Sequence, residues 1–201
     1  MKHDPRRTAL FVLSSLNKGR HTLDRILADI ENKKLFVSRR DQALFYALVY
    51  GVLRWRGRLD WIISHFSKTR IDKIDPAVMN ILRLGLFQII YLNRIPVSAA
   101  VNTSVEMATP FAAPWIKRFI NGLLRNAARG YKKVPYPDPD KNPAHSLSVR
   151  KSFPEWLIKR WLNRFGLKET EELCDAINTI PPITVRTNTL RTTRDDLTES
   201  L

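Results

Sequence analysis

The apolar residues of this sequence recur every three or four positions through most of its first 130 residues. That spacing places them on one face of an α-helix, and start and stop signals for helices separate the successive repeats. An alternating pattern, typical of a half-buried strand, occurs only near the C-terminus. The first part of the chain is therefore predicted to be all-helical.

Capping signals set the bounds of the expected helices. Asp4-Pro5 and Asp75-Pro76 each offer an N-cap followed by a proline in the first turn, and Ser38 with Asp41 resembles a capping box. Ser98 is expected to cap the helix that follows Pro96. The expected helices span residues 5–19, 21–33, 38–66, 76–95, 98–109 and 114–130, and Gly51 and Gly57 are expected to bend or split the third.

The segment from Val78 to Ile90 is apolar nearly all round. A helix without a polar face must be surrounded by other helices. This segment is therefore predicted to form the centre of a helical bundle.

The composition changes after residue 131, where residues 132–146 hold four prolines and indicate an extended linker. Residues 147–180 are expected to form a helical connector, with Ser152 and Glu155 as a capping box and Gly166 as a stop between two short helices. Residues 183–188 are β-branched and alternating, which predicts a strand before a last helix from Thr193. Since a lone strand is not stable, residues 181–201 are interpreted as the start of an α/β subdomain.

The charge of the chain restricts its partners. It has 34 Lys and Arg against 19 Asp and Glu, a net charge of +15. Such an excess favours a polyanion, because neutralising phosphates releases counterions, although a merely solvated basic surface has the same composition. The longest apolar run is far too short to cross a bilayer, and no N-terminal signal peptide is recognised. One cysteine and four scattered histidines predict neither a disulfide nor a metal site, and the expected location is the cytoplasm.

Two basic clusters are candidate RNA-binding sites. Cations in the first turn of a helix are unfavourable by roughly 0.3–1 kcal/mol each, so a phosphate is the expected compensating group at the first cluster. The second cluster follows one helix face opposite its apolar stripe. The clusters are Lys2, Arg6 and Arg7, and Lys117, Arg118, Asn121, Arg125 and Arg129. Exposed arginines that tolerate a small cost, and an ordinary solvated face, are the alternatives.

A third basic group, Arg54, Arg56 and Arg58, interleaves with Trp55 and Trp61. The tryptophans are expected to belong to the core, because Trp55 is in register with the apolar stripe. No pattern for reading bases is found, so the expected binding is to phosphates with a preference for shape.

Several stretches of the sequence resemble the N-terminal region of the Sun/Fmu type of 16S ribosomal RNA cytosine-5 methyltransferases, whose first domain is similar to the transcription antitermination factor NusB. They are residues 5–9, 41–55, 95–102, 105–108, 119–125 and 182–188. The resemblance implies a NusB-like RNA-binding bundle over residues 1–131, RNA contacts around Arg6 and Arg7, and an α/β (RRM-like) subdomain from Ile183. Thr103 departs from the family, where an acidic residue is expected, and this puts any role of that position in doubt.

The chemistry that the resemblance implies requires a cysteine nucleophile and a loop for S-adenosylmethionine. Cys174 lies in a predicted helix without the family's flanking prolines, and we interpret it as a packing residue. The seven glycines are isolated, so no cofactor cradle is predicted within these residues. The cofactor is expected only for a methyltransferase domain outside this chain.

The leading hypothesis is that the chain docks ribosomal RNA for that domain, which is also a candidate partner. The first alternative is a stand-alone NusB-like RNA-binding factor in antitermination. The second is a protein-interaction module whose basic face meets an acidic partner.

Overall fold

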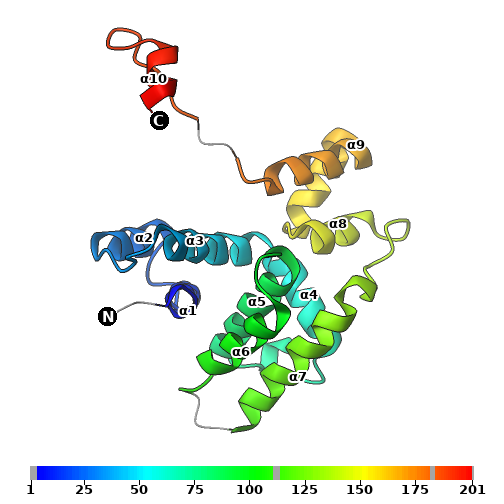
Figure 1. Ribbon diagram of the computed structural model, residues 1–201. Helices are drawn as coiled ribbons and strands as arrows, with labels where there is room; N and C mark the ends of the chain where they lie inside the picture. The colour runs from blue at the N-terminus through cyan, green and yellow to red at the C-terminus, as the bar shows by residue number, and fades with distance from the viewer. Residues whose placement is uncertain (1–3, 111–113, 182–183, 201) are drawn as a thin grey trace.

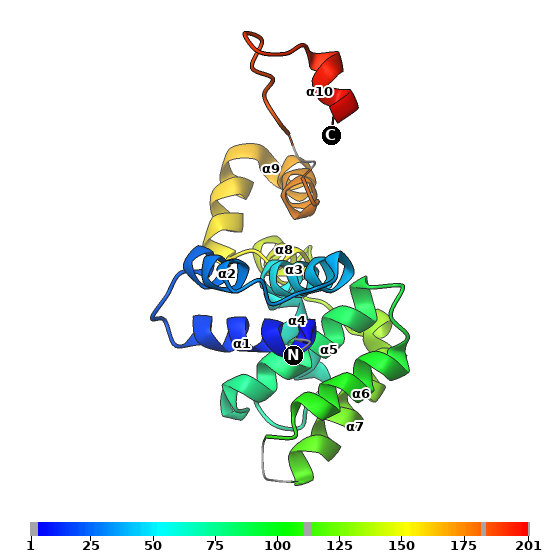
Figure 2. The same cartoon turned by 60° about the vertical axis from the view of Figure 1, so that its left-hand side comes forward.

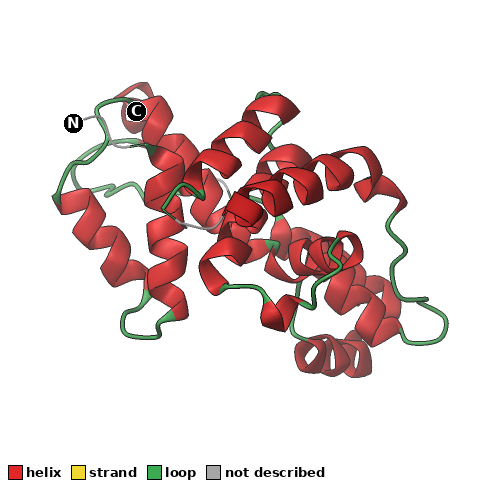
Figure 3. Ribbon diagram, turned by 90° about the horizontal axis from the view of Figure 1, so that it is seen from below, coloured by secondary structure: helices red, strands yellow, loops and turns green. Residues whose placement is uncertain are grey.

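The computed structural model describes residues 4–110, 114–181 and 184–200, and Figure 1 shows a bundle of helices followed by a smaller helical unit. Figure 3 shows helices and loops and no strand in these residues. The expected all-helical class is confirmed. The elements are α1 (Pro5–Asn17), α2 (Leu23–Asn32), α3 (Arg39–Arg54), α4 (Arg56–Phe66), η1 (Ile71–Lys73), α5 (Pro76–Tyr91), α6 (Val97–Met107), α7 (Pro114–Gly130), η2 (Tyr131–Lys133), α8 (Pro143–Lys151), α9 (Glu155–Asn178) and α10 (Arg194–Ser200).

Helix α5 is the centre of the bundle, as its all-round apolar sequence predicted. It packs against α1, α3, α4, α6 and α7, and Ile81, Leu82 and Leu84 are fully buried. Gly85 lets its neighbours come close, because a Cβ there would lie 2.6 Å from both Leu124 Cδ1 and Ser104 Oγ. Helices α6 and α7 therefore pack on the backbone of α5.

Helices α1 to α3 form the side of the bundle that is seen best in Figure 2, with α3 above α1. Asp4 caps α1 by accepting a hydrogen bond from Arg6 N at 2.9 Å, and Ser38 caps α3 through Arg40 N at 3.1 Å. Both caps confirm the sequence signals. The expected long helix splits at Trp55, between the two glycines considered for that role.

Two expectations within the bundle were wrong in detail. Helix α5 ends at Tyr91, before Pro96, and a short loop intervenes. Ser98 is not the cap of α6, because Pro96 already occupies the N-cap position and the helix begins at Val97. A proline prevents a helix from continuing past it, but the helix can end several residues earlier. The position of Pro96 therefore does not mark the last residue of α5.

The expected linker over residues 132–146 was partly wrong. Pro143 opens α8, with Asn142 accepting a hydrogen bond from His145 N at 3.0 Å. Proline is well suited to the first turn of a helix, where its missing N–H has no partner to lose. The stretch before it has no helix or strand over residues 134–138, as expected of a linker, and a turn follows over residues 139–141.

The expected capping box at Ser152 is also wrong. Ser152 follows α8 in the left-handed region, with φ 62°, and its Oγ accepts a hydrogen bond from Arg58 N at 2.7 Å. It therefore joins α8 to α4 and does not start α9. Gly166, with φ 77°, does interrupt α9 as its sequence indicated.

Helices α8 and α9 share a small core of their own. It consists of Ala144, Leu147, Ile158 and Cys174, with Phe153, Trp161 and Leu162 packed against it. Helix α8 also packs on α4, which connects this unit to the bundle.

No strand forms over residues 184–188, where one was expected; Ile183 lies outside the described residues. A strand needs a partner for its backbone groups, and none is present in the part of the chain that the structure describes. Helix α10 buries no residue and lies apart from the bundle in Figures 1 and 2.

Candidate nucleic-acid interface

The first turn of α1 holds the first predicted cluster, and Arg6 and Arg7 differ in their surroundings. Arg6 is half-buried, and its Nε donates a 2.7 Å hydrogen bond to Oε1 of the fully buried Gln88. Arg7 is exposed; its Nε lies 3.9 Å from Asp4 Oδ2, and it donates a long bond of 3.4 Å to the carbonyl of Glu106. Asp4 therefore compensates part of the positive charge of Arg7, for which the sequence analysis expected a phosphate. Lys2 lies outside the described residues.

Arg6 lines a groove that sequence reasoning did not find. The groove has a volume of about 720 Å³ and lies among α1, the start of α3 and the loop after α5. Arg40 and Arg94 line it together with Asn93, and both arginines are exposed. Three guanidinium groups from separate parts of the sequence are therefore brought to one groove.

The groove carries an unbalanced positive charge. No carboxylate of the described residues lies within 4.0 Å of the side-chain nitrogens of Arg40 or Arg94, and none lines the groove. The first-turn position of Arg40 on α3 repeats that of Arg6 on α1, and this signal was present in the sequence. Arg94 lies in a loop, where no periodicity points to it.

The second predicted cluster follows the outer face of α7 as expected. Arg118, Arg125 and Arg129 are exposed, while Arg125 Nε donates to Asn121 Oδ1 at 3.0 Å. Lys117 is half-buried. Within the described residues, no carboxylate reaches ion-pair distance of these cations. The face is basic and solvated.

The structure does not merge the two predicted clusters into one surface. Helix α1 packs on α2, α3 and α5, whereas α7 packs on α4, α5 and α6. Arg7 reaches α6 through the carbonyl of Glu106, so α6 lies between the two basic regions.

Arg58, from the third basic group, has a structural role. Its guanidinium lies 5.6 Å from the ring centroid of Trp55 and 5.8 Å from that of Tyr136, and its Nε donates to Tyr136 Oη at 3.1 Å. Burial alone would lower the pKa of Arg58, but Tyr91 and Tyr136 outweigh it and raise the pKa. Trp55 and Trp61 pack against the core, as predicted.

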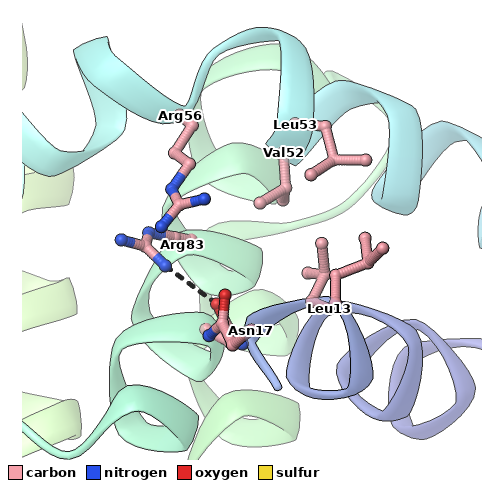
Figure 4. A pocket seen from close by; sticks show the side chains of 8 residues that line it. Leu13, Asn17, Val52, Leu53, Arg56 and Arg83 are labelled. Atoms are coloured by element: carbon pink, nitrogen blue, oxygen red, sulfur yellow. Dashed lines mark hydrogen bonds between the residues drawn. The ribbon is translucent and has the colours of Figure 1, made fainter. Parts of the chain in front are cut away.

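Arg56 faces a small cavity of about 60 Å³ that Arg83 also lines (Figure 4). Arg83 is almost buried and forms an ion pair with Asp60, with Nε to Oδ1 at 2.6 Å, and its NH1 donates to Asn80 Oδ1 at 2.9 Å. This pair joins α4 to α5 and belongs to the core rather than to the basic surface.

Groups suited to catalysis or to a metal are not assembled in residues 4–110, 114–181 and 184–200. No three metal-ligating side chains come together there. Cys174 is fully buried, and burial raises the pKa of its thiol to about 11. A thiol that is buried and protonated at neutral pH does not act as a nucleophile. The described helices also include none that is long and apolar enough to span a bilayer.

Comparison with known families gives two matches, which leave residues 130–152 between them. Residues 3–129 match the NusB family, and residues 153–201 match the ferredoxin-like domain described as Methyltr_RsmF/B-like. The second match starts within the expected helical connector.

Curated relatives align with almost the whole chain. A probable ribosomal RNA small subunit methyltransferase B of Synechocystis is 34% identical over 98% of this chain and 43% of its own length. The corresponding protein of Bacillus subtilis is 35% identical over 82% of this chain and 36% of its own length. The chain thus spans less than half the length of these relatives.

Solved structures show the same fold. The crystal structure of PH0851 superposes with a TM-score of 0.64 at 18% identity, covering 100% of this chain and 45% of that protein. Thermotoga maritima NusB superposes with a TM-score of 0.54 at 20% identity, covering 67% of this chain and 96% of that protein.

Proposed function

The chain belongs to the NusB family, and from that premise we propose that it is the RNA-binding N-terminal part of a 16S rRNA (cytosine-5) methyltransferase that uses S-adenosylmethionine. In this role it docks ribosomal RNA for a catalytic domain outside residues 1–201. The role is cytoplasmic, where ribosomal RNA is found.

The observation that carries the proposal is the groove lined by Arg6, Arg40 and Arg94. Guanidinium groups suit phosphate because their fork of N–H donors matches two phosphate oxygens. Arg6 and Arg40 also stand in the first turn of their helices, where the helix dipole favours an anion. RNA phosphates supply the negative charge that the surrounding carboxylates do not.

The residues of this chain do not fit a cofactor site for S-adenosylmethionine. The sole thiol is buried, and the seven glycines are isolated, with Gly51 and Gly85 packed against side chains of the core. The two relatives are named methyltransferases and are more than twice as long as their matched parts. Methyl transfer is accordingly assigned to the remainder of a longer protein, and RNA docking to this part.

Salt dependence of binding to a 16S rRNA fragment tests the proposal. Each phosphate contact contributes about 0.7 to 0.9 to the slope of log K against log salt. The double variant Arg40→Ala/Arg94→Ala should bind at least about tenfold more weakly and lose about 1.4 to 1.8 from that slope. Arg6 is left intact, because its bond to Gln88 also supports the fold.

A matched control removes two cations elsewhere. Arg70 is paired with Asp72 and Lys159 with Glu155, so Arg70→Ala/Lys159→Ala has the same net charge as the test variant without touching the groove. Equal losses in the two variants would show that only net charge matters and would contradict the groove assignment. Arg118→Ala/Arg125→Ala measures in the same way whether the α7 face contacts RNA.

The alternatives give different results. Tight binding to an acidic protein that is insensitive to salt would favour a protein-interaction module. A stand-alone NusB-like factor is disfavoured by residues 153–201, which match a methyltransferase-associated domain beyond the NusB region.

A further inference from the structure

An aromatic pocket adjoins the basic groove. Ala47, Tyr91 and Leu92 line both, so the two hollows are continuous. The pocket has a volume of about 730 Å³ and is mostly apolar. This size lies within the range of pockets that hold small aromatic ligands.

The floor of the pocket is a run of stacked rings. The ring centroids of Trp55 and Tyr91 are 5.1 Å apart at 18°, and those of Phe87 and Tyr91 are 5.2 Å apart at 26°. Gly51 allows this arrangement, because a Cβ at that position would collide with the ring of Phe87. A glycine in the middle of α3 costs helix stability, and here it makes room for the ring of Phe87.

The walls of the pocket differ in character. Tyr46 and Tyr50 stack at 6.1 Å and 18°, and Tyr50 is 45% exposed. Ile180 and Pro181, which follow α9, also line the pocket. A pocket lined by aromatic rings and apolar side chains is suited to a flat, unsaturated group.

The charge around the pocket indicates what that group belongs to. Arg54 lines the pocket, and no Asp or Glu among the described residues lines either the pocket or the groove. A basic groove that leads into stacked aromatic side chains is the arrangement by which proteins hold single-stranded nucleic acid, with phosphates on the cations and bases on the rings.

We propose that the aromatic pocket receives an unpaired base of the RNA strand whose phosphates lie along Arg6, Arg40 and Arg94. This inference rests on the proposed function and adds to it that the bound RNA is single-stranded at this point. Bases in an RNA duplex are stacked on each other and inaccessible to such a pocket, whereas loops and bulges can turn one out.

Fluorescence of a base analogue tests the inference. A single-stranded RNA that carries 2-aminopurine should lose fluorescence when it binds the chain, because the analogue stacks on an aromatic ring. Tyr50→Ala should bind this RNA roughly tenfold more weakly and lose the quenching, with its salt slope unchanged, since stacking on one aromatic side chain contributes about 5- to 140-fold to affinity. Tyr50→Phe keeps the ring and should restore both.

Trp156→Ala is the matched control, since Trp156 is 65% exposed and lies outside the pocket. It should bind and quench like the unaltered chain. A fully paired RNA duplex with 2-aminopurine at the same position should bind more weakly. Its fluorescence should not fall further when the chain is added.

The outcomes separate the two proposals. If the unaltered chain binds RNA with the salt dependence expected of the groove, but Tyr50→Ala binds and quenches equally well, the pocket does not take a base and only this inference is overturned. Equal binding of single strand and duplex without quenching also overturns this inference alone. If the chain binds no RNA, the proposed function fails and this inference with it.

Discussion

Helices α1 to α7 share one large core, whereas α8 and α9 share a core of a few side chains and use α4 as their support. The difference follows from the sequences. Helix α5 is apolar on every side and must be surrounded, but α9 buries only Ile158, Thr170 and Cys174. One region is thus held by its own burial of apolar surface, and the other by contacts to its neighbour.

The exposed side chains continue this contrast. Large apolar residues are exposed on α9, including Trp156, Leu167 and Ile177. Such residues on a small unit indicate a surface that another part of a protein covers. The bundle exposes large apolar residues as well, including Phe11 at 63% and Trp115 at 59%. What distinguishes it is the basic groove lined by Arg6, Arg40 and Arg94.

The largest expected loss of stability comes from breaking an ion pair within the bundle. In the Arg83–Asp60 pair the side chains are only 8% and 22% exposed. Asp60→Ala leaves the guanidinium buried without a counter-charge and should lower the free energy of unfolding by about 3–5 kcal/mol. Chemical denaturation measures this loss.

The matched change in the other region is Asp175→Ala. Asp175 accepts from Lys151 Nζ at 2.7 Å, but it is 60% exposed and Glu171 remains as a second partner at 3.1 Å. The expected loss is at most about 1 kcal/mol. Equal losses from the two variants would contradict the contrast between the regions.

Cavity-forming substitutions should show which helices each core stabilises. Leu82→Ala removes a fully buried side chain from α5 and should cost about 2–5 kcal/mol, with faster hydrogen exchange throughout α1 to α7. Ile158→Ala makes a similar cavity in the small core. Its faster exchange should be confined to α8 and α9, and loss of protection in α5 would show that the chain unfolds as one unit.

The junction between the regions should give an effect of about 1 kcal/mol. Ser152→Ala removes the acceptor of the bond from Arg58 N, and Tyr136→Phe removes the acceptor for Arg58 Nε. Each lost bond should cost roughly 0.5–1.5 kcal/mol. Exchange should quicken in α8 and α9 more than in the bundle, and an effect seen only in the bundle would contradict the support that α4 gives to α8.

The sequence predicted the bundle better than the unit after it. The bounds of α7, Pro114 to Gly130, and the N-caps Asp4, Ser38 and Asp75 were found because local chemistry determines them. Helix α8 was missed because a run of prolines indicates a linker, and the role of Pro143 as a first-turn residue depends on the residues after it. Local signals give helices their ends, but they do not distinguish a proline that stops a helix from one that starts it.

The candidate site was predicted only in part, for a similar reason. Arg6 was found from its place at a helix start, and Arg40 has the same signal. Arg94 is brought to the groove by the loop after α5, and Tyr50 lines the adjoining pocket together with Phe87 and Tyr91 of α5. Such convergence is tertiary, and no spacing along the chain shows it.

The smallest expected effect is a pH dependence of the small core. Burial raises the pKa of the Cys174 thiol from 9.0 to about 11; Lys151 lowers it slightly, and Asp175 and Glu171 raise it. The folded state therefore favours the neutral thiol. Its contribution to stability is fully present below about pH 9 and is lost as the pH rises toward about 11, because the unfolded chain ionises first.

Urea titrations of the unaltered chain and of Cys174→Ala, at about pH 8 and at about pH 9.5, isolate this contribution, because the other groups with shifted pKa values are present in both proteins. Burial raises the pKa of Tyr46 and of Tyr91 to about 12. Burial acts to lower the pKa of Lys151, but the carboxylates of Asp175 and Glu171 outweigh it and raise the pKa. The expected loss is roughly 0.8 kcal/mol, read from tryptophan fluorescence, to which Trp161 on the small core contributes. Cys174→Ala should show a flatter dependence over the same range. If both proteins lose the same free energy of unfolding between the two pH values, burial does not raise the pKa of the Cys174 thiol. The small core is then more open to water than the packing of α8 and α9 implies.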